Sequence, residues 1–163
     1  MNEATDGKKH AFTIEWRDGF KISIPDIDRE HKHLFSLVKA LDINTIDETV
    51  NELLDYVVTH FTNEQGLMEK SGYPAFEQHL KLHEEFSAQV ADFLGNGEDW
   101  SEDKVNALRR FLNRWLIGHI MTHDLRFGKW YMDHLKQVTE ALQHRDKETK
   151  KEAAGFFGRL FGH

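Results

Sequence analysis

Pairs of histidine and carboxylate residues at helical spacing are the feature that most limits what this chain can fold into. His60 and Glu64 are four residues apart, and so are His79 and His83. Residues four apart lie on one face of an α-helix, and the apolar residues around each pair continue that face. Imidazole and carboxylate groups are ligands that suit iron, zinc or manganese. The spacing therefore predicts two helices that direct metal ligands into a shared interior.

Two further amphipathic segments each carry a histidine on their apolar stripe. His31 lies among Ile27, Leu34 and Phe35, and His119 continues the apolar row of the last such segment. Polar groups in a core need partners, so burying all these imidazoles and carboxylates without a metal would be very costly. The set as a whole predicts a metal centre between the helices.

Spacing leaves the last ligand open. His123 lies four residues after His119, as in the other pairs, whereas Asp124 lies about 140° from His119 around a regular helix. Asp124 nevertheless interrupts an apolar row, where an unpaired carboxylate would be penalised. Spacing alone therefore prefers His123, whereas the interrupted apolar row favours Asp124.

The amino-acid composition excludes several kinds of metal site and several kinds of partner. The 163 residues include no cysteine, which removes disulfides, iron–sulfur clusters and thiolate zinc sites, so nitrogen and oxygen must hold any metal. The formal net charge of −7 argues against a nucleic-acid partner. No run approaches the ~20 apolar residues of a membrane span, and the first residues are too polar for a signal peptide. We therefore expect no nucleic-acid partner, no transmembrane segment and a cytoplasmic location.

Apolar residues at helical spacing predict an all-α fold, an up-down-up-down antiparallel four-helix bundle, because short connections favour antiparallel neighbours. We expect an N-terminal arm up to about Pro25, with Phe12, Ile14 and Trp16 across the bundle end. The first helix follows the arm and includes residues 27–41.

The remaining helix boundaries follow from capping signals. A capping box of Thr45 and Glu48 is expected to open the second helix, which ends at the Ser71-Gly72 turn. The third helix is expected to open at Pro74. The fourth is expected to begin after Ser101, a good N-cap residue.

Two regions are expected along the chain. Residues 1–135 form the bundle with its arm, and residues 136–163 form a charged, then aromatic and glycine-containing C-terminal extension. Three glycines in the extension weaken the case for a helix there. Its exposed aromatic residues suggest a contact with a partner protein or a membrane surface, and the alternative is a segment folded back on the bundle or a disordered end.

The pattern resembles the hemerythrin family, specifically the bacterial single-domain hemerythrins (bacteriohemerythrins). The likeness runs from about Trp16 to Tyr131 and is carried by the segments Ile-Asp-Arg-Glu-His-Lys at 27–32, His-Phe-Thr-Asn-Glu at 60–64, Gly-Tyr-Pro at 72–74, His-x-x-x-His at 79–83, and His-Ile-x-x-x-Asp at 119–124. Small departures occur at Glu30, where glutamine is common, Ser23, where glycine is common, and Gln65, where a second glutamate is frequent. None of the departures is a ligand.

The resemblance implies a full set of metal ligands, and it favours Asp124 over His123 as the last of them. One iron ion would be held by His79, His83 and His119, and the other by His31 and His60. Glu64 and Asp124 would bridge the two non-heme iron ions (Fe2+/Fe3+), together with a solvent-derived oxo or hydroxo group. Three imidazoles and three bridges fill one octahedral ion, whereas the second ion keeps an open position.

The function that the resemblance implies is reversible dioxygen binding at that open position, for oxygen carriage, storage or sensing. Five neutral imidazoles and two carboxylates supply less negative charge than the carboxylate-rich di-iron oxidases. Trp115, Leu116 and Ile120 are candidates to line a dry O2 pocket. We therefore expect no enzymatic activity. A di-iron oxidase, peroxidase or nitric-oxide-handling enzyme is the first alternative, and a signalling module acting through the C-terminal tail is the second.

Overall fold

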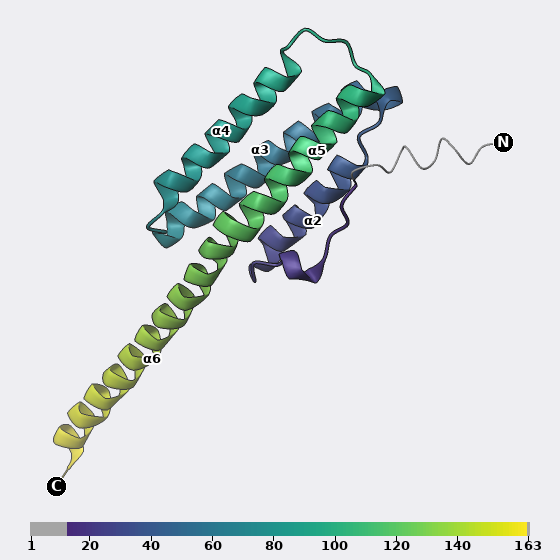
Figure 1. Ribbon diagram of the computed structural model, residues 1–163. Coiled ribbons are helices and arrows are strands. Elements are labelled where there is room, and N and C mark those ends of the chain that lie inside the picture. The colour runs from purple at the N-terminus through teal and green to yellow at the C-terminus, as the bar shows by residue number, and fades with distance from the viewer. Residues whose placement is uncertain (1–12, 163) are drawn as a thin grey trace. The chain divides into compact units, whose positions relative to one another are not determined.

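Four long helices lie side by side in the computed structural model, which describes residues 13–162 (Figure 1). Helix α2 packs against α3 and α5, and α3 packs against α4. This arrangement confirms the predicted all-α, up-down-up-down four-helix bundle. The bundle helices are α2 (Pro25–Lys39), α3 (Ile46–Ser71), α4 (Phe76–Leu94) and α5 (Glu102–His119).

Local signals end the helices much as the sequence indicates. Pro25 occupies the first turn of α2, where its missing N–H is not needed. Gly72 ends α3 with a left-handed φ of 72°, a conformation that glycine adopts without strain. The N–H of Tyr73 then donates to the carbonyl of Met68 at 3.0 Å, which closes the cap. The Ser101 hydroxyl accepts the N–H of Lys104 at 3.1 Å and caps α5 as predicted.

Two boundary predictions are wrong in detail. Thr45 precedes α3 but makes no side-chain cap. A 3-10 turn leads straight into the helix, and Asp42 supplies the cap of that turn by accepting the N–H of Asn44 at 2.8 Å. Pro74 does not open α4, which begins two residues later at Phe76. Gly72 and Tyr73 form the cap of α3, and the residues between Tyr73 and Phe76 form the turn that connects it to α4.

The predicted fourth helix is not regular throughout. After α5, residues Ile120–Asp124 form a π-helical segment, and α6 (Leu125–Phe161) continues from it. The N–H of Leu125 donates to the carbonyl of Ile120, five residues earlier. One extra residue is therefore accommodated in this turn of the helix.

The described part of the N-terminal arm packs against α2. The rings of Trp16 and Phe20 lie 5.9 Å and 5.4 Å from that of Phe35. The N–H of Ile22 donates to the buried carboxylate of Asp28 at 2.7 Å. Asp28, in the first turn of α2, therefore anchors the arm. Phe12, expected in the same arm, lies outside the described residues.

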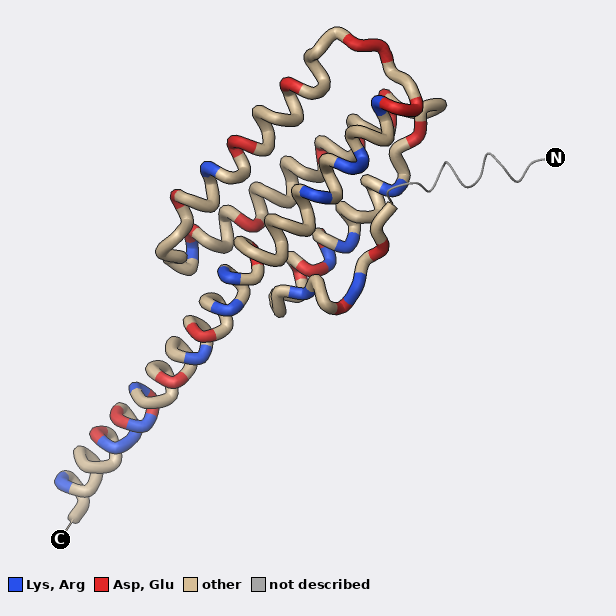
Figure 2. Tube along the Cα trace, viewed as in Figure 1, with Lys and Arg blue, Asp and Glu red and all other residues tan. Residues whose placement is uncertain are grey.

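The chain divides into two compact units, the first ending at Lys129 and the second beginning at Trp130. The second unit is the remainder of α6, whose acidic and basic residues are interspersed along the helix (Figure 2). The expectation that glycines would oppose a helix here is wrong, since α6 includes Gly155 and Gly158. Extending an existing helix needs no new nucleation, so isolated glycines cost little. The predicted domain boundary at residue 135 stays a prediction.

Within residues 13–162, no helix is both long enough and apolar enough to cross a membrane.

Candidate metal centre

All seven predicted ligands come together inside the bundle, and all are buried. Their ligand atoms form two groups, each within 4.8 Å. The first group contains three histidines and the second contains two. Glu64 and Asp124 belong to both groups. The members of the larger group are Glu64, His79, His83, His119 and Asp124, and those of the smaller are His31, His60, Glu64 and Asp124.

The three histidines of the larger group form a tight triangle. Nε2 of His83 lies 3.1 Å from Nε2 of both His79 and His119. The remaining side, between His119 and His79, is 3.2 Å. Each ring can present at most one Nε2 proton, so protons alone do not satisfy three such contacts with linear hydrogen bonds. A shared cation does, because it is bound by the lone pair of each nitrogen.

The triangle has the dimensions of one face of an octahedron. A metal ion with bonds of about 2.1 Å to nitrogen holds neighbouring octahedral ligand atoms about 3.0 Å apart and tetrahedral ones about 3.4 Å apart. The two separations of 3.1 Å are nearer the octahedral value, and the third, 3.2 Å, lies midway between the two values. Five donor residues also exceed the number that a tetrahedral ion accepts.

Each carboxylate extends from the larger group to the smaller one. Glu64 Oε2 lies 3.1 Å from His79 Nε2 and 3.2 Å from His83 Nε2. Asp124 Oδ1 lies 3.0 Å from His119 Nε2, while Asp124 Oδ2 lies 3.1 Å from His31 Nε2. Two oxygens on each of two carboxylates are the means by which protein side chains bridge neighbouring cations.

Several of these buried atoms lack hydrogen-bond partners in the described part of the chain. They are Oε1 of Glu64, both carboxylate oxygens of Asp124 and both ring nitrogens of His31. Unpartnered buried carboxylate oxygens are strongly disfavoured. Two cations would satisfy the oxygens and one nitrogen of His31. The donor set, the spacing and the orphaned atoms therefore all fit a pair of metal ions.

A second layer of polar residues orients two of the histidines. Nδ1 of His60 lies 3.1 Å from Oε1 of Glu30, whose other oxygen accepts the side-chain amide of Asn63 at 2.9 Å. Nδ1 of His83 lies 2.9 Å from the amide of Gln65. Such contacts fix the ring and leave Nε2 for a metal. The sequence marked Glu30 and Gln65 as unusual residues beside ligands, but it assigned them no role.

The π-helical segment brings His119 and Asp124 to the same site. Residues five apart come onto one face when the helix contains an extra residue, so the 140° separation of a regular helix does not apply. His123, the alternative by spacing, is in neither ligand group. Its ring lies 5.5 Å from that of His119 and lines a pocket beside the site.

The protonation of the cluster reflects its two buried carboxylates. Burial would lower the pKa of His79, but its close contacts with the carboxylates of Asp124 and Glu64, and their negative charges, raise it to about 9. Burial and the charges of neighbouring histidines lower the pKa of His83 to about 4, against the opposing effect of Glu64. Burial and Asp124 would raise the pKa of Glu64, but His79 and His83 lower it to about 2. The cluster thus keeps its carboxylates charged and attracts positive charge.

Apolar side chains enclose the cluster. The Trp115 ring stacks on His119, with centroids 4.3 Å apart, and Phe61 stacks on His83 at 3.7 Å. Trp115 and Leu116 also line a cavity of about 10 Å³ that is bounded only by apolar side chains. Ile120 is buried but does not line this cavity. A cavity of this size and lining is just large enough for one small molecule.

Comparison with known proteins identifies the family. A family model described as the hemerythrin HHE cation binding domain matches residues 23–131. The chain belongs to the hemerythrin family. Membership confirms the sequence-based identification and, with it, the prediction of an oxygen-binding protein rather than an enzyme. A hemerythrin domain also implies binding of non-heme di-iron.

Individual relatives support this assignment. A bacteriohemerythrin of Stenotrophomonas maltophilia is 31% identical over 156 residues, covering 90% of this chain and 94% of the relative. One from Pseudomonas aeruginosa is 33% identical, covering 91% and 98%. A hemerythrin alpha subunit of Lingula anatina is 34% identical over 69% of this chain and 90% of its own. A solved wild-type hemerythrin matches with a TM-score of 0.61 and 26% identity, covering 71% and 95% of the two chains.

Proposed function

We propose that the seven clustered side chains hold two non-heme iron ions and that the chain binds dioxygen reversibly at this centre. His79, His83 and His119 would hold one ion, and His31 and His60 the other. Glu64 and Asp124 would bridge them, together with a solvent-derived oxo or hydroxo group. The observation that carries the proposal is the presence of both carboxylates in both ligand groups.

The unequal histidine count supports a specific site for O2. Three imidazoles, two carboxylate oxygens and one shared solvent-derived atom would complete an octahedral ion. The ion with two imidazoles would keep one position without a protein ligand. The iron pair, when bound, supplies the two electrons with which O2 is held reversibly. In this proposal O2 would bind at the ion held by His31 and His60.

The surrounding side chains support binding over turnover. We propose that Trp115, Leu116 and Ile120 exclude water from the O2 side of the centre. The apolar cavity lined by Trp115 and Leu116 offers a dry volume next to the cluster, and a dry pocket limits proton delivery. Glu30 and Gln65 hold His60 and His83 in their orientation, so that the ligand atoms need not rearrange.

Metal analysis combined with absorption spectra tests the proposal. Protein from iron-rich growth should contain two iron ions per chain. The reduced protein should develop an oxygen-dependent absorption band under air, and the band should disappear under nitrogen and return on re-exposure. Fewer than two ions, or a band that decays with peroxide release and does not return, would contradict the proposal. The second outcome would favour the enzymatic alternative.

The C-terminal extension supports a separate proposal about partners. Phe156, Phe157, Leu160 and Phe161 are all more than half exposed on the last turns of α6. We propose that this aromatic group contacts a partner protein or a membrane surface. Deleting the residues after Lys151, followed by partner pull-down and by co-sedimentation with anionic vesicles, tests both forms of contact. We also propose that the protein is located in the cytoplasm.

A further inference from the structure

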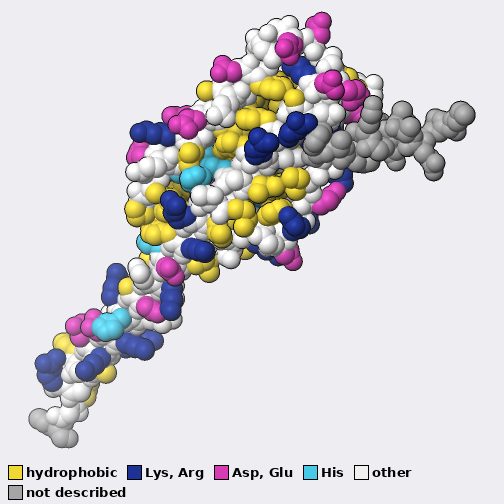
Figure 3. All heavy atoms as spheres, in the orientation of Figure 1, with side chains coloured by type: hydrophobic (Ala, Val, Ile, Leu, Met, Phe, Trp, Pro, Cys, Tyr) yellow, Lys and Arg dark blue, Asp and Glu magenta, His cyan; other side chains and the backbone are white. Residues whose placement is uncertain are grey.

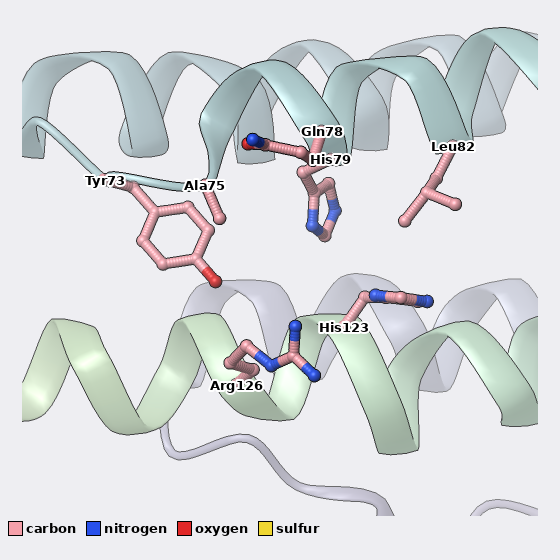
Figure 4. A pocket seen from close by; sticks show the side chains of 7 residues that line it. All are labelled: Tyr73, Ala75, Gln78, His79, Leu82, His123 and Arg126. Carbon is pink, nitrogen blue, oxygen red and sulfur yellow. The ribbon is translucent and has the colours of Figure 1, made fainter.

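A pocket of about 190 Å³ opens directly beside the metal centre. The turn before α4 and the first part of α4 supply one side, and the π segment and the start of α6 supply the other (Figure 4). Figure 3 shows histidine side chains at the surface of the bundle, with a basic side chain beside them. The lining residues are Tyr73, Ala75, Gln78, His79, Leu82, His123 and Arg126.

The polar groups of the pocket suit an anion. Arg126 is permanently charged and presents several donors in a fixed fork that matches two oxygens of one ligand. The amide of Gln78 and the ring of His123 offer further N–H groups. No carboxylate is among the residues that line the pocket. A negatively charged ligand would therefore meet attraction and donors on both sides.

His79 connects this pocket to the metal centre. Its Nε2 faces Glu64 and Asp124 at 3.1 and 3.2 Å, and its ring forms part of the pocket wall (Figure 4). A histidine that binds metal through Nε2 carries its proton on Nδ1 and normally donates it to an acceptor. Glu30 is positioned as such an acceptor for His60, and the side-chain amide nitrogen of Gln65 contacts Nδ1 of His83. Among the described residues, none supplies such an acceptor to Nδ1 of His79. A ligand bound in the pocket would be in position to accept this proton.

We propose that this pocket binds a small oxyanion of the phosphate or sulfate type. Two of its oxygens meet the Arg126 guanidinium, and another accepts the Nδ1 proton of His79. The volume of about 190 Å³ accommodates such an ion with some of its water. An anion at this position strengthens His79 as a metal ligand, so occupancy of the pocket alters the properties of the metal centre. This coupling rests on the proposed di-iron function, whereas anion binding itself does not.

Calorimetric titration of the iron-loaded protein with inorganic phosphate tests the pocket. Ionic strength is kept constant with sodium chloride, because the chloride ion does not offer paired oxygens. We expect saturable binding at one site, and affinity at least about tenfold lower in Arg126→Met. Lys129→Met is the matched control, since Lys129 is an exposed base close by on α6 that does not line the pocket. Absence of saturable binding, or equal affinity in Arg126→Met, would overturn the proposal.

The coupling is tested on the same samples by absorption spectroscopy. Phosphate should shift the bands of the oxidised di-iron centre with the midpoint found by calorimetry, and the shift should be lost in Arg126→Met. Iron content is measured after titration to exclude extraction of the metal. Phosphate binding with an unchanged spectrum would overturn the coupling. If the protein keeps two iron ions but binds no phosphate, the proposal of an anion pocket is refuted and the di-iron proposal stands. If the protein binds phosphate but holds fewer than two iron ions, the di-iron proposal alone is refuted.

Discussion

Glu30 places a carboxylate oxygen 3.1 Å from Nδ1 of His60, whereas the corresponding partner of His83 is the uncharged amide of Gln65. The two proposed iron sites therefore differ in the charge behind their histidines as well as in the number of histidines. Because a carboxylate draws the Nδ1 proton more strongly than an amide does, His60 becomes the stronger electron donor. This favours the oxidised state of the ion at which O2 is proposed to bind.

Exchanging Glu30 for glutamine tests this charge asymmetry. Glu30→Gln removes the negative charge but keeps a hydrogen-bonding group of the same size. We expect the reduction potential of the centre to rise by roughly 60 mV, equivalent to tenfold for one electron. The measurement is a spectroelectrochemical titration. Gln65→Glu should move the potential in the opposite direction, and unchanged potentials in both variants would show that the asymmetry has no effect.

Loss of one ligand should deplete the metal. His83→Ala removes a buried imidazole from the three-histidine group, so we expect fewer than two irons per chain and a lower melting temperature. Metal analysis and thermal unfolding provide the measurements. His33→Ala is the control, because His33 is exposed and belongs to neither ligand group. Its effect should remain within about 0.5 kcal/mol, and normal iron content in His83→Ala would contradict the ligand assignment.

Metal affinity should depend on pH through His79. The pKa of His79 in the metal-free fold is about 9, above its ordinary 6.5. The imidazolium therefore stabilises the metal-free fold fully below about pH 6.5, and this contribution is lost as the pH rises through 9. A metal ion must displace that proton, so Zn2+ affinity should rise at least about tenfold from pH 7 to pH 8. Chelator competition at the two pH values measures it, and equal affinities would refute the prediction.

Water exclusion by Leu116 can be separated from its contribution to stability. Leu116→Ala enlarges the apolar cavity beside the cluster and should speed autoxidation of the oxygenated protein several-fold, as followed by the decay of its absorption band. Leu108→Ala serves as the control, because Leu108 is equally buried on α5 but does not line the cavity. Both changes should destabilise the bundle by about 2–5 kcal/mol. Equal autoxidation rates would argue against a role for Leu116 in the pocket.

Contact between the arm and α6 depends on a glycine. A Cβ atom at Gly128 would overlap the carbonyl oxygen of Ile22, a backbone atom that cannot move alone. Gly128→Ala should therefore destabilise the protein by about 1–3 kcal/mol in urea unfolding. Gly118→Ala, on an exposed helical position with open space around it, should instead be neutral or stabilise by up to about 1 kcal/mol. Equal effects would show that the close approach is not limiting.

The bundle and most of the site were predictable because helical periodicity acts locally. His60 with Glu64 and His79 with His83 show their common face directly in the sequence, and the structure brings each pair to the same point. The residues that escaped prediction act over longer ranges. Glu30 on α2 meets His60 on α3, and Gln65 on α3 meets His83 on α4. No spacing rule for a single helix predicts such partners.

Asp124 was predictable only through family resemblance. Regular helix geometry favours His123, and no residue between Ile120 and Asp124 marks a π turn in the way that proline marks a kink. The extra residue is tolerated because tertiary contacts hold the helix on both sides of it. The helical tail was missed for a related reason, since glycine propensity describes isolated helices and α6 begins inside the bundle.

The π segment also sets the orientation of everything in the first unit that follows it. An added residue rotates the next turn by about 100°, and this rotation faces Phe127 towards Tyr73, with ring centroids 4.9 Å apart, and Gly128 towards the arm at Ile22. Removing one residue from this segment would move the carboxylate of Asp124 away from the ligand groups, and it would also break the contact between Gly128 and the arm. Metal retention and attachment of the N-terminal segment are thus two outcomes of the same insertion.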